Sequence, residues 1–257
     1  MAKVIAVFNQ KGGVGKTTTN VNLSACIASK GKRVCVIDID PQGNSTSGFG
    51  VDKDQLEYSI YDVMLNQIDI KKVIVKTEYD HIDLIPSSSE LAGAEIELVA
   101  TKKRETILKR AVATIKDNYD YVFVDCPPSL GLLTINSLSA VDSVLIPIQC
   151  EYYALEGVSQ LMNTIQLVKT SLNPKLEVQG VVLSMFDGRT NLSIQVVDEV
   201  KNYFKGKVYT TIIPRNVRLA EAPSHGKPVI YYDKKSKGAE AYSELAEEFI
   251  ELEEDVI

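Results

Sequence analysis

Short apolar runs alternate along the chain with segments whose apolar residues recur every three or four positions. Uninterrupted apolar runs predict strands buried on both faces, and recurrence at three and four predicts helices with one buried face. The clearest helical pattern places Val158, Leu161 and Ile165 on one face. The expected strands are 3–9, 33–38, 81–86, 121–125, 143–148, 178–184 and 208–213, and the expected helices are 16–30, 60–66, 102–116, 132–138, 157–171, 192–204 and 239–253.

This alternation of strands and helices predicts an α/β fold with a doubly wound, mostly parallel sheet and helices on both faces. Residues 41–57 are rich in Gly, Ser, Asn and Gln, and residues 214–238 are mostly polar, so we expect both segments to be loops. The spacing of the elements favours a single domain over residues 1–257 rather than two small ones.

A glycine-rich segment joins the first expected strand to the first expected helix. Residues 9–18 read Asn-Gln-Lys-Gly-Gly-Val-Gly-Lys-Thr-Thr. Inward-turned backbone N–H groups and a helix N-terminus bind phosphate, a lysine reaches the terminal phosphates and a threonine hydroxyl ligates Mg²⁺. A glycine turn between solvated lysines is the alternative, but the order of the elements favours a nucleotide site. Its expected residues are Gly12, Gly13, Val14, Gly15, Lys16, Thr17 and Thr18, with Lys16 and Thr17 in the two named roles.

Three aspartates stand at or just after the ends of expected strands, namely Asp38, Asp40 and Asp125. Ligands of such sheets bind beyond the carboxyl ends of the strands. Asp125 is expected to hold Mg²⁺, through water because Mg²⁺ keeps several of its waters. A turn aspartate before Pro127 is the alternative for Asp125, and Asp40 before Pro41 is also typical of a turn.

The glycine-rich segment departs from the usual G-x-x-x-x-G-K-[ST] pattern, because Gln10 stands at the first glycine position and Lys11 precedes Gly12. This form resembles the deviant Walker A motif of the ParA/MinD family of ATPases. The resemblance implies ATP and Mg²⁺ as cofactors and an ATP-bound homodimer in which Lys11 reaches the partner's nucleotide. Asp38-Ile39-Asp40-Pro41-Gln42 resembles the family's D-x-D-P-Q motif, whose second aspartate orients the attacking water near Mg²⁺. The catalytic residues implied are Lys11, Lys16 and Asp40, and the metal ligands are Thr17, Asp40 and Asp125.

The Pro-Arg-Asn stretch at 214–216 resembles the family's adenine-binding stretch, which implies that Pro214 and Asn216 hold the base; a simple turn is the alternative. The net charge of −6 argues against a nucleic-acid partner. From residue 184 to 237, however, ten Lys or Arg stand against five Asp or Glu, a net charge of +5, so the rest of the chain carries −11. Scattered arginines are equally typical of a solvated surface. Residues 189–191 and 214–228 resemble chromosomal ParA proteins, also called Soj, and this implies non-specific DNA binding through Arg189, Arg218, Lys201 and Lys227.

The resemblance implies a cytoplasmic, nucleoid-associated partitioning ATPase that is released from DNA when a ParB-type partner stimulates hydrolysis. The chain begins directly at the first strand, so we expect no N-terminal helix-turn-helix extension. A MinD-like regulator that cycles on membranes is the alternative. It needs a basic amphipathic C-terminal helix, whereas residues 240–255 hold eight acids and no base. The four cysteines do not match a reductase that bridges a dimer with an iron–sulfur cluster, and Asp40 argues against a nucleotide-binding adaptor without turnover.

Overall fold

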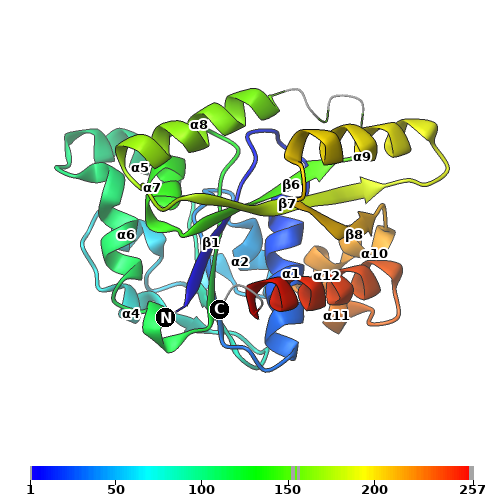
Figure 1. Cartoon of the computed structure of the whole chain (residues 1–257). Helices are drawn as coiled ribbons and strands as arrows, with labels where there is room; N and C mark the ends of the chain where they lie inside the picture. Colours follow the sequence, from blue (N-terminus) through cyan, green and yellow to red (C-terminus); the bar gives the residue numbers. More distant parts are fainter. Residues whose placement is uncertain (1, 152–153, 155–156, 255–257) are drawn as a thin grey trace.

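The computed structural model describes residues 2–151, 154 and 157–254, so Asp255, in the acidic stretch, lies outside it. One eight-stranded sheet runs in the order β3-β4-β2-β5-β1-β6-β7-β8 (Figure 1). Neighbouring strands are parallel except at the edge, where β3 is antiparallel to β4. The predicted fold class is thereby confirmed. The strands are β1 (Lys3–Val7), β2 (Val34–Asp38), β3 (Val75–Lys76), β4 (Ile82–Ile85), β5 (Tyr121–Asp125), β6 (Ser143–Gln149), β7 (Glu177–Phe186) and β8 (Val208–Pro214).

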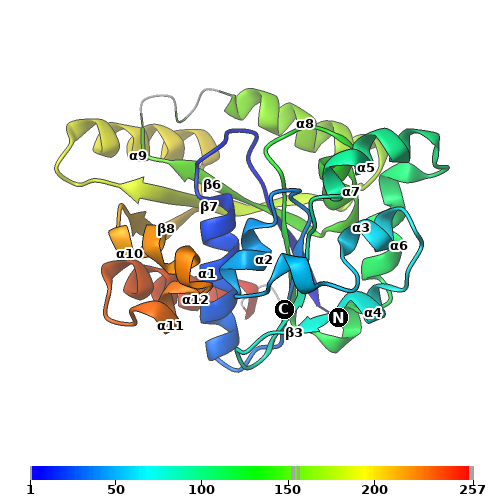
Figure 2. The same ribbon diagram turned by 180° about the vertical axis from the view of Figure 1, so that it is seen from behind.

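Helices cover both faces of the sheet (Figures 1 and 2). Successive residues of β5 point to opposite faces, so Val122 and Val124 join the core under α7, α8 and α9, while Phe123 joins the core under α1 and α12. The uninterrupted apolar run of this strand follows from that double burial. The helices are α1 (Lys16–Ser29), α2 (Asn44–Gly48), α3 (Ile60–Met64), α4 (Ile70–Val73), α5 (Leu91–Glu97), α6 (Ile107–Val112), α7 (Leu132–Ala140), α8 (Val158–Ser171), α9 (Asn191–Phe204), α10 (Val217–Glu221), α11 (Val229–Tyr232) and α12 (Lys237–Glu254).

The two segments expected to be loops contain helices, so those expectations are wrong. Residues 41–57 include α2 and a 3₁₀ turn, Lys53–Gln55, and residues 214–238 include α10, a 3₁₀ turn (Ala222–His225) and α11. Each of these helices is four or five residues long, too short to show a helical period. Individual side-chain contacts fix such short helices instead: the Asn216 side chain accepts a hydrogen bond from the backbone N–H of Arg218 and caps α10.

The helix expected at 102–116 is shorter than its apolar pattern suggests. A 3₁₀ turn, Arg104–Thr106, precedes α6, which ends at Val112, and a second 3₁₀ turn (Lys116–Asn118) follows. The buried Asn136 amide oxygen accepts hydrogen bonds from the backbone N–H groups of Ile107 and Leu108 and so defines where α6 begins. The pattern also gave no sign of α4, β3, α5 or the 3₁₀ turn Leu98–Ala100.

Candidate functional site

The glycine-rich segment forms a tight turn at the carboxyl end of β1, directly before α1. Gly13 and Gly15 have φ angles of 74° and 89°, a backbone conformation that side chains with a Cβ rarely adopt. Two side chains tie the turn to neighbouring strands: Asn9 Nδ2 donates to the Pro147 carbonyl at 2.8 Å, and Ser184 Oγ donates to the Val14 carbonyl at 2.8 Å. No atom lies within 4 Å of where a Cβ would stand at Gly12 or Gly13, so a ligand can approach this backbone closely.

Lys16 begins α1 and is buried, with 7% of its surface exposed. Its Nζ donates to the Lys11 carbonyl at 3.0 Å. Burial lowers the pKa of Lys16, and the negative charges of Asp125 and Asp40 oppose that change. A buried ammonium group that is held by one carbonyl inside a glycine-rich turn is suited to binding phosphate oxygens.

Asp38 and Asp125 lie side by side at the carboxyl edge of the sheet. The register of β2 and β5 pairs them directly, and Asp125 also pairs with Val7, the last residue of β1. Both carboxylates are fully buried. Burial, followed by the charge of Asp38, raises the pKa of Asp125 to about 8, and the side chains of Ser45 and Thr17 act in the opposite direction.

The Asp125 carboxylate fits a Mg²⁺ site. Ser45 Oγ donates to its Oδ2 at 2.8 Å, whereas Oδ1 is buried and lacks a hydrogen-bond partner in the part of the chain that the structure describes. An unpartnered buried carboxylate oxygen is costly, and a nearby cation or its water would satisfy it. With Thr17 on the adjacent first turn of α1, the donor set consists of hydroxyl and carboxylate oxygens, which Mg²⁺ prefers.

Asp38 holds the segment that carries Asp40. Its Oδ2 accepts hydrogen bonds from the backbone N–H and the hydroxyl of Thr46, at 2.7 and 2.8 Å, and its Oδ1 accepts from the backbone N–H of Asp40 at 3.2 Å. The Thr46 hydroxyl in turn accepts from the Ser87 N–H at 3.0 Å. Burial raises the pKa of Asp38 to about 6, and the Thr46 hydrogen bonds act against this rise. Sequence reasoning did not single out Ser45, Thr46 or Ser87.

A cavity of about 280 Å³ opens beside the turn, between α1, the end of β8 and α10. Pro214 and Asn216 both line it together with Gly15 and Thr18. Its place next to the expected phosphate site and its mixed apolar lining are typical of a pocket for a planar base. The other lining residues are Arg215, from the same Pro-Arg-Asn stretch, and six residues that the sequence pattern did not indicate as part of a site, namely Ser184, Met185, Ile213, Leu219, Ala220 and Tyr242.

The four expected DNA-binding residues are exposed and lie outside the cavity, near the β8 end of the sheet. Arg189 precedes α9 and Lys201 is in its last turn, whereas Arg218 is on α10 and Lys227 precedes α11. Figures 1 and 2 show α9 on one face of this edge and α10 and α11 on the other. The two arginines form ion pairs: Arg189 with Asp187 at 2.6 Å, and Arg218 with Glu221 at 2.7 Å and with Asp233 at 3.2 Å.

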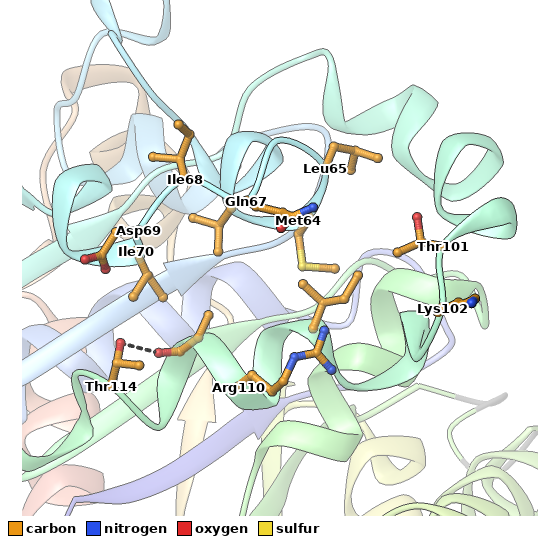
Figure 3. A pocket seen from close by; sticks show the side chains of 13 residues that line it. Met64, Leu65, Gln67, Ile68, Asp69, Ile70, Thr101, Lys102, Arg110 and Thr114 are labelled. Atoms are coloured by element: carbon orange, nitrogen blue, oxygen red, sulfur yellow. Dashed lines mark hydrogen bonds between the residues drawn. The ribbon is translucent and has the colours of Figure 1, made fainter.

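A larger cavity of about 580 Å³ lies far from this chemistry, between the α3–α4 connection and α6 (Figure 3). The side chains of Met64 and Arg110 point into it, and none of the expected site residues lines it. Within the residues that the structure describes, every helix is too short or too polar to span a lipid bilayer.

Comparisons with known proteins identify the family of this chain. Residues 2–178 match the model of the AAA domain family. The chain is 61% identical to the sporulation initiation inhibitor protein Soj of Bacillus subtilis, over 96% of this chain and 98% of that protein. It is 51% identical to the chromosome partitioning protein ParA of Caulobacter vibrioides, over 98% and 96%. Among solved structures, the cobyrinic acid a,c-diamide synthase of Mycobacterium smegmatis with bound ADP and magnesium has a TM-score of 0.84 and 39% identity, over 96% of this chain and 93% of that one.

The three-dimensional likeness therefore extends along nearly the whole chain to a protein solved with ADP and magnesium bound. The similar sequences include a protein named Soj and a protein named for chromosome partitioning. The glycine-rich turn, the paired aspartates and the cavity lined by Pro214 and Asn216 lie at the carboxyl edge of the sheet, where ligands are expected. This chain belongs to the ParA/Soj family of chromosome-partitioning P-loop ATPases.

Proposed function

We propose that this protein is a nucleotide-controlled DNA-binding switch in chromosome partitioning: an ATP-bound homodimer coats the nucleoid, and a ParB-type partner stimulates hydrolysis and release. One observation carries the ATP part of the proposal. The turn at Gly15 and Lys16, the buried Asp125 carboxylate and the cavity lined by Pro214 and Asn216 meet at one edge of the sheet. The 51% identity to the chromosome partitioning protein ParA of Caulobacter vibrioides supports the biological role.

The chain's own residues divide the work of ATP hydrolysis. Mg²⁺ bound with ATP would neutralise phosphate charge, and Thr17 and Asp125 are the residues that would hold it, with Asp40 close by. Lys16 binds the terminal phosphates, and the backbone N–H groups of residues 12–18 orient them. Asp40 orients the attacking water, and its position is set by the hydrogen bond from its N–H to Asp38. Phosphoryl transfer of this kind depends on positioning and charge more than on covalent chemistry.

Dimerisation is proposed to depend on Lys11, which lies in the turn and would reach the nucleotide of the partner subunit. The test is the mass of Lys11→Ala in solution with a non-hydrolysable ATP analogue, compared with the unsubstituted protein. We expect a dimer without the substitution and a monomer that still binds the analogue with it. Analogue-dependent pairing of Lys11→Ala would remove the shared-lysine arrangement.

DNA binding is proposed to use Arg189 and Arg218, with Lys201 and Lys227 in support. Such binding is directed mainly at phosphates, so the logarithm of affinity should fall with the logarithm of salt concentration by about 0.9 for each contact. The test is a titration with DNA of arbitrary sequence, with ADP and then with the ATP analogue. We expect binding only with the analogue, weaker binding and a shallower slope for Arg189→Ala and Arg218→Ala, and no loss of dimerisation.

A MinD-like membrane role receives no support from the chain's charge. The likeness to the cell division ATPase MinD of Pyrococcus furiosus is 25% identity at a TM-score of 0.79, far below the 61% identity to Soj. The last helix, α12, carries acidic residues throughout its length, and an anionic lipid surface would repel them. A cytoplasmic, nucleoid-associated location is therefore part of the proposal.

A further inference from the structure

Two carboxylates from two different elements hold the guanidinium group of Arg218. Glu221, at the end of α10, accepts from Nη1 at 2.7 Å, and Asp233, just after α11, lies 3.2 Å from Nε. Glu221 is itself held in place, because the Tyr232 hydroxyl donates to its Oε2 at 3.3 Å and the His225 ring stacks on Tyr232 with centroids 4.9 Å apart. We call Arg218, Glu221 and Asp233 the Arg218 cluster.

The charge of this cluster opposes the role proposed for Arg218. One guanidinium and two carboxylates sum to a net charge of −1, whereas Arg189 pairs with a single carboxylate, that of Asp187, among the residues that the structure describes. A DNA phosphate that approaches Arg218 must therefore displace a carboxylate or share the guanidinium with it, and it is repelled by both acids. The three side chains are only partly exposed, at 46%, 39% and 35%, so solvent screens the cluster incompletely.

We propose that Glu221 and Asp233 are positioning residues that hold Arg218 away from DNA phosphates and thereby limit the affinity of the DNA-binding surface. This inference rests on the proposed DNA-binding function. It assigns to the two acids a role opposite to that of the neighbouring basic residues. Their removal releases Arg218 as a full phosphate contact.

The Arg218 cluster is also tied to the nucleotide cavity. Helix α10 is five residues long, and Asn216, Leu219 and Ala220 line the cavity, while Arg218 and Glu221 form the ion pair on its exposed side. A base that occupies the cavity contacts one side of a helix whose other side carries the cluster. The cluster is therefore placed where the nucleotide state can alter how firmly Arg218 is held.

The test compares DNA affinity and its salt dependence for Glu221→Gln, Asp233→Asn and the double variant, all as full-length protein with a non-hydrolysable ATP analogue. At low salt, each single substitution should tighten binding roughly threefold, the effect in water of the attraction between the released Arg218 charge and a phosphate about 6 Å away, and the double variant should gain roughly tenfold. For the double variant, the slope of the logarithm of DNA affinity against the logarithm of salt concentration should steepen by about 0.9 for each Arg218 released. The matched control, Glu240→Gln with Glu251→Gln on α12, removes the same net charge at two positions that form no ion pair with an arginine within the described part of the chain.

A double-mutant cycle with Arg218→Ala separates the outcomes. In the unsubstituted background, Glu221→Gln with Asp233→Asn should increase DNA affinity. In the Arg218→Ala background, the same two substitutions should increase it no more than the α12 control does. An equal gain with and without Arg218, a gain no larger than that of the control, or an unchanged salt slope would overturn the proposal. If Arg218→Ala alone leaves DNA affinity unchanged, it is the proposed DNA surface that is wrong. Unchanged melting temperatures and unchanged dimerisation confirm that folding is not the cause.

Discussion

Replacing Thr46 with valine removes one hydroxyl from the segment that carries Asp40 and keeps the shape of the side chain. That hydroxyl makes two buried hydrogen bonds: it donates to Asp38 Oδ2 at 2.8 Å and accepts from the Ser87 N–H at 3.0 Å. Thr46 and Ser87 are fully buried, so water cannot replace either bond. The backbone N–H of Thr46 still donates to Asp38 at 2.7 Å in the variant, so the network is weakened rather than abolished.

The expected loss of unfolding free energy follows from these two bonds. A hydrogen bond to a charged group contributes about 1.5–3 kcal/mol, and an orphaned buried N–H costs about 1–3 kcal/mol. Some relaxation of the α2 segment reduces the sum, so we expect Thr46→Val to cost about 3 kcal/mol. The loss should be larger at pH 8 than at pH 5. The folded-state pKa of Asp38 is about 6, so its carboxylate is ionised, and most in need of the hydroxyl, only above that pH.

The assay is urea unfolding of Thr46→Val without nucleotide or Mg²⁺, at both pH values. Thr170→Val is the control, because Thr170 is exposed on α8 and its hydroxyl bonds only to carbonyls of its own helix, at 3.0 Å. The control should lie within about 0.5 kcal/mol of the unsubstituted protein. A loss below about 1 kcal/mol for Thr46→Val, or an equal loss at the two pH values, would refute the role given to Asp38.

Three further substitutions probe the site. Lys16→Ala should weaken ATP binding by about 100-fold, or ~2.8 kcal/mol, in a calorimetric titration, and unchanged affinity would contradict the phosphate assignment. Asp40→Ala should keep ATP binding but accumulate an ATP-bound dimer detectable by light scattering, whereas normal turnover would exclude Asp40 from the mechanism. Gly238→Ala places a Cβ 2.7 Å from Leu219 Cγ. Overpacking costs ~1–3 kcal/mol and exceeds the helix-propensity gain of at most ~1 kcal/mol, so stability and ATP affinity should both fall. Lys237→Ala is its exposed neighbour and should change neither.

Much of the fold could be predicted because strands that are buried on both faces of the sheet appear in the sequence as uninterrupted apolar runs. The strand expected at 121–125 matches β5 at both ends, because residues 121–124 form an apolar run that Asp125 ends. The segments around α2, α10 and α11 could not be predicted in this way. A local side-chain cap fixes the start of α10, whereas a residue distant in sequence holds the start of α11, where the Asn22 side chain accepts from the N–H of Val229 at 2.7 Å.

The candidate site likewise has one part that the sequence predicts and another part that it does not. The half that is expected to bind phosphate is contiguous in sequence, so residues 9–18 alone predict the roles of Lys16 and Thr17. The supporting contacts join separate segments, and no local pattern indicates that Ser45 bonds to Asp125 or that Tyr242 lines the cavity beside Thr18. The ion pairs of Arg218 likewise depend on how α10 and α11 lie together.

The alternating burial of β5 residues also fixes the position of Asp125 at the candidate ion site. Asp125 lies level with Asp38 and Val7 only in one register of three adjacent strands. A slip of β5 by a single position would place Phe123 in the core under α7, α8 and α9 and Val124 in the core under α1 and α12. The side chains packed on both faces of the sheet would then no longer fit. Packing in the hydrophobic core thus fixes the strand register, and the register fixes the relative positions of the two carboxylates at the edge of the sheet.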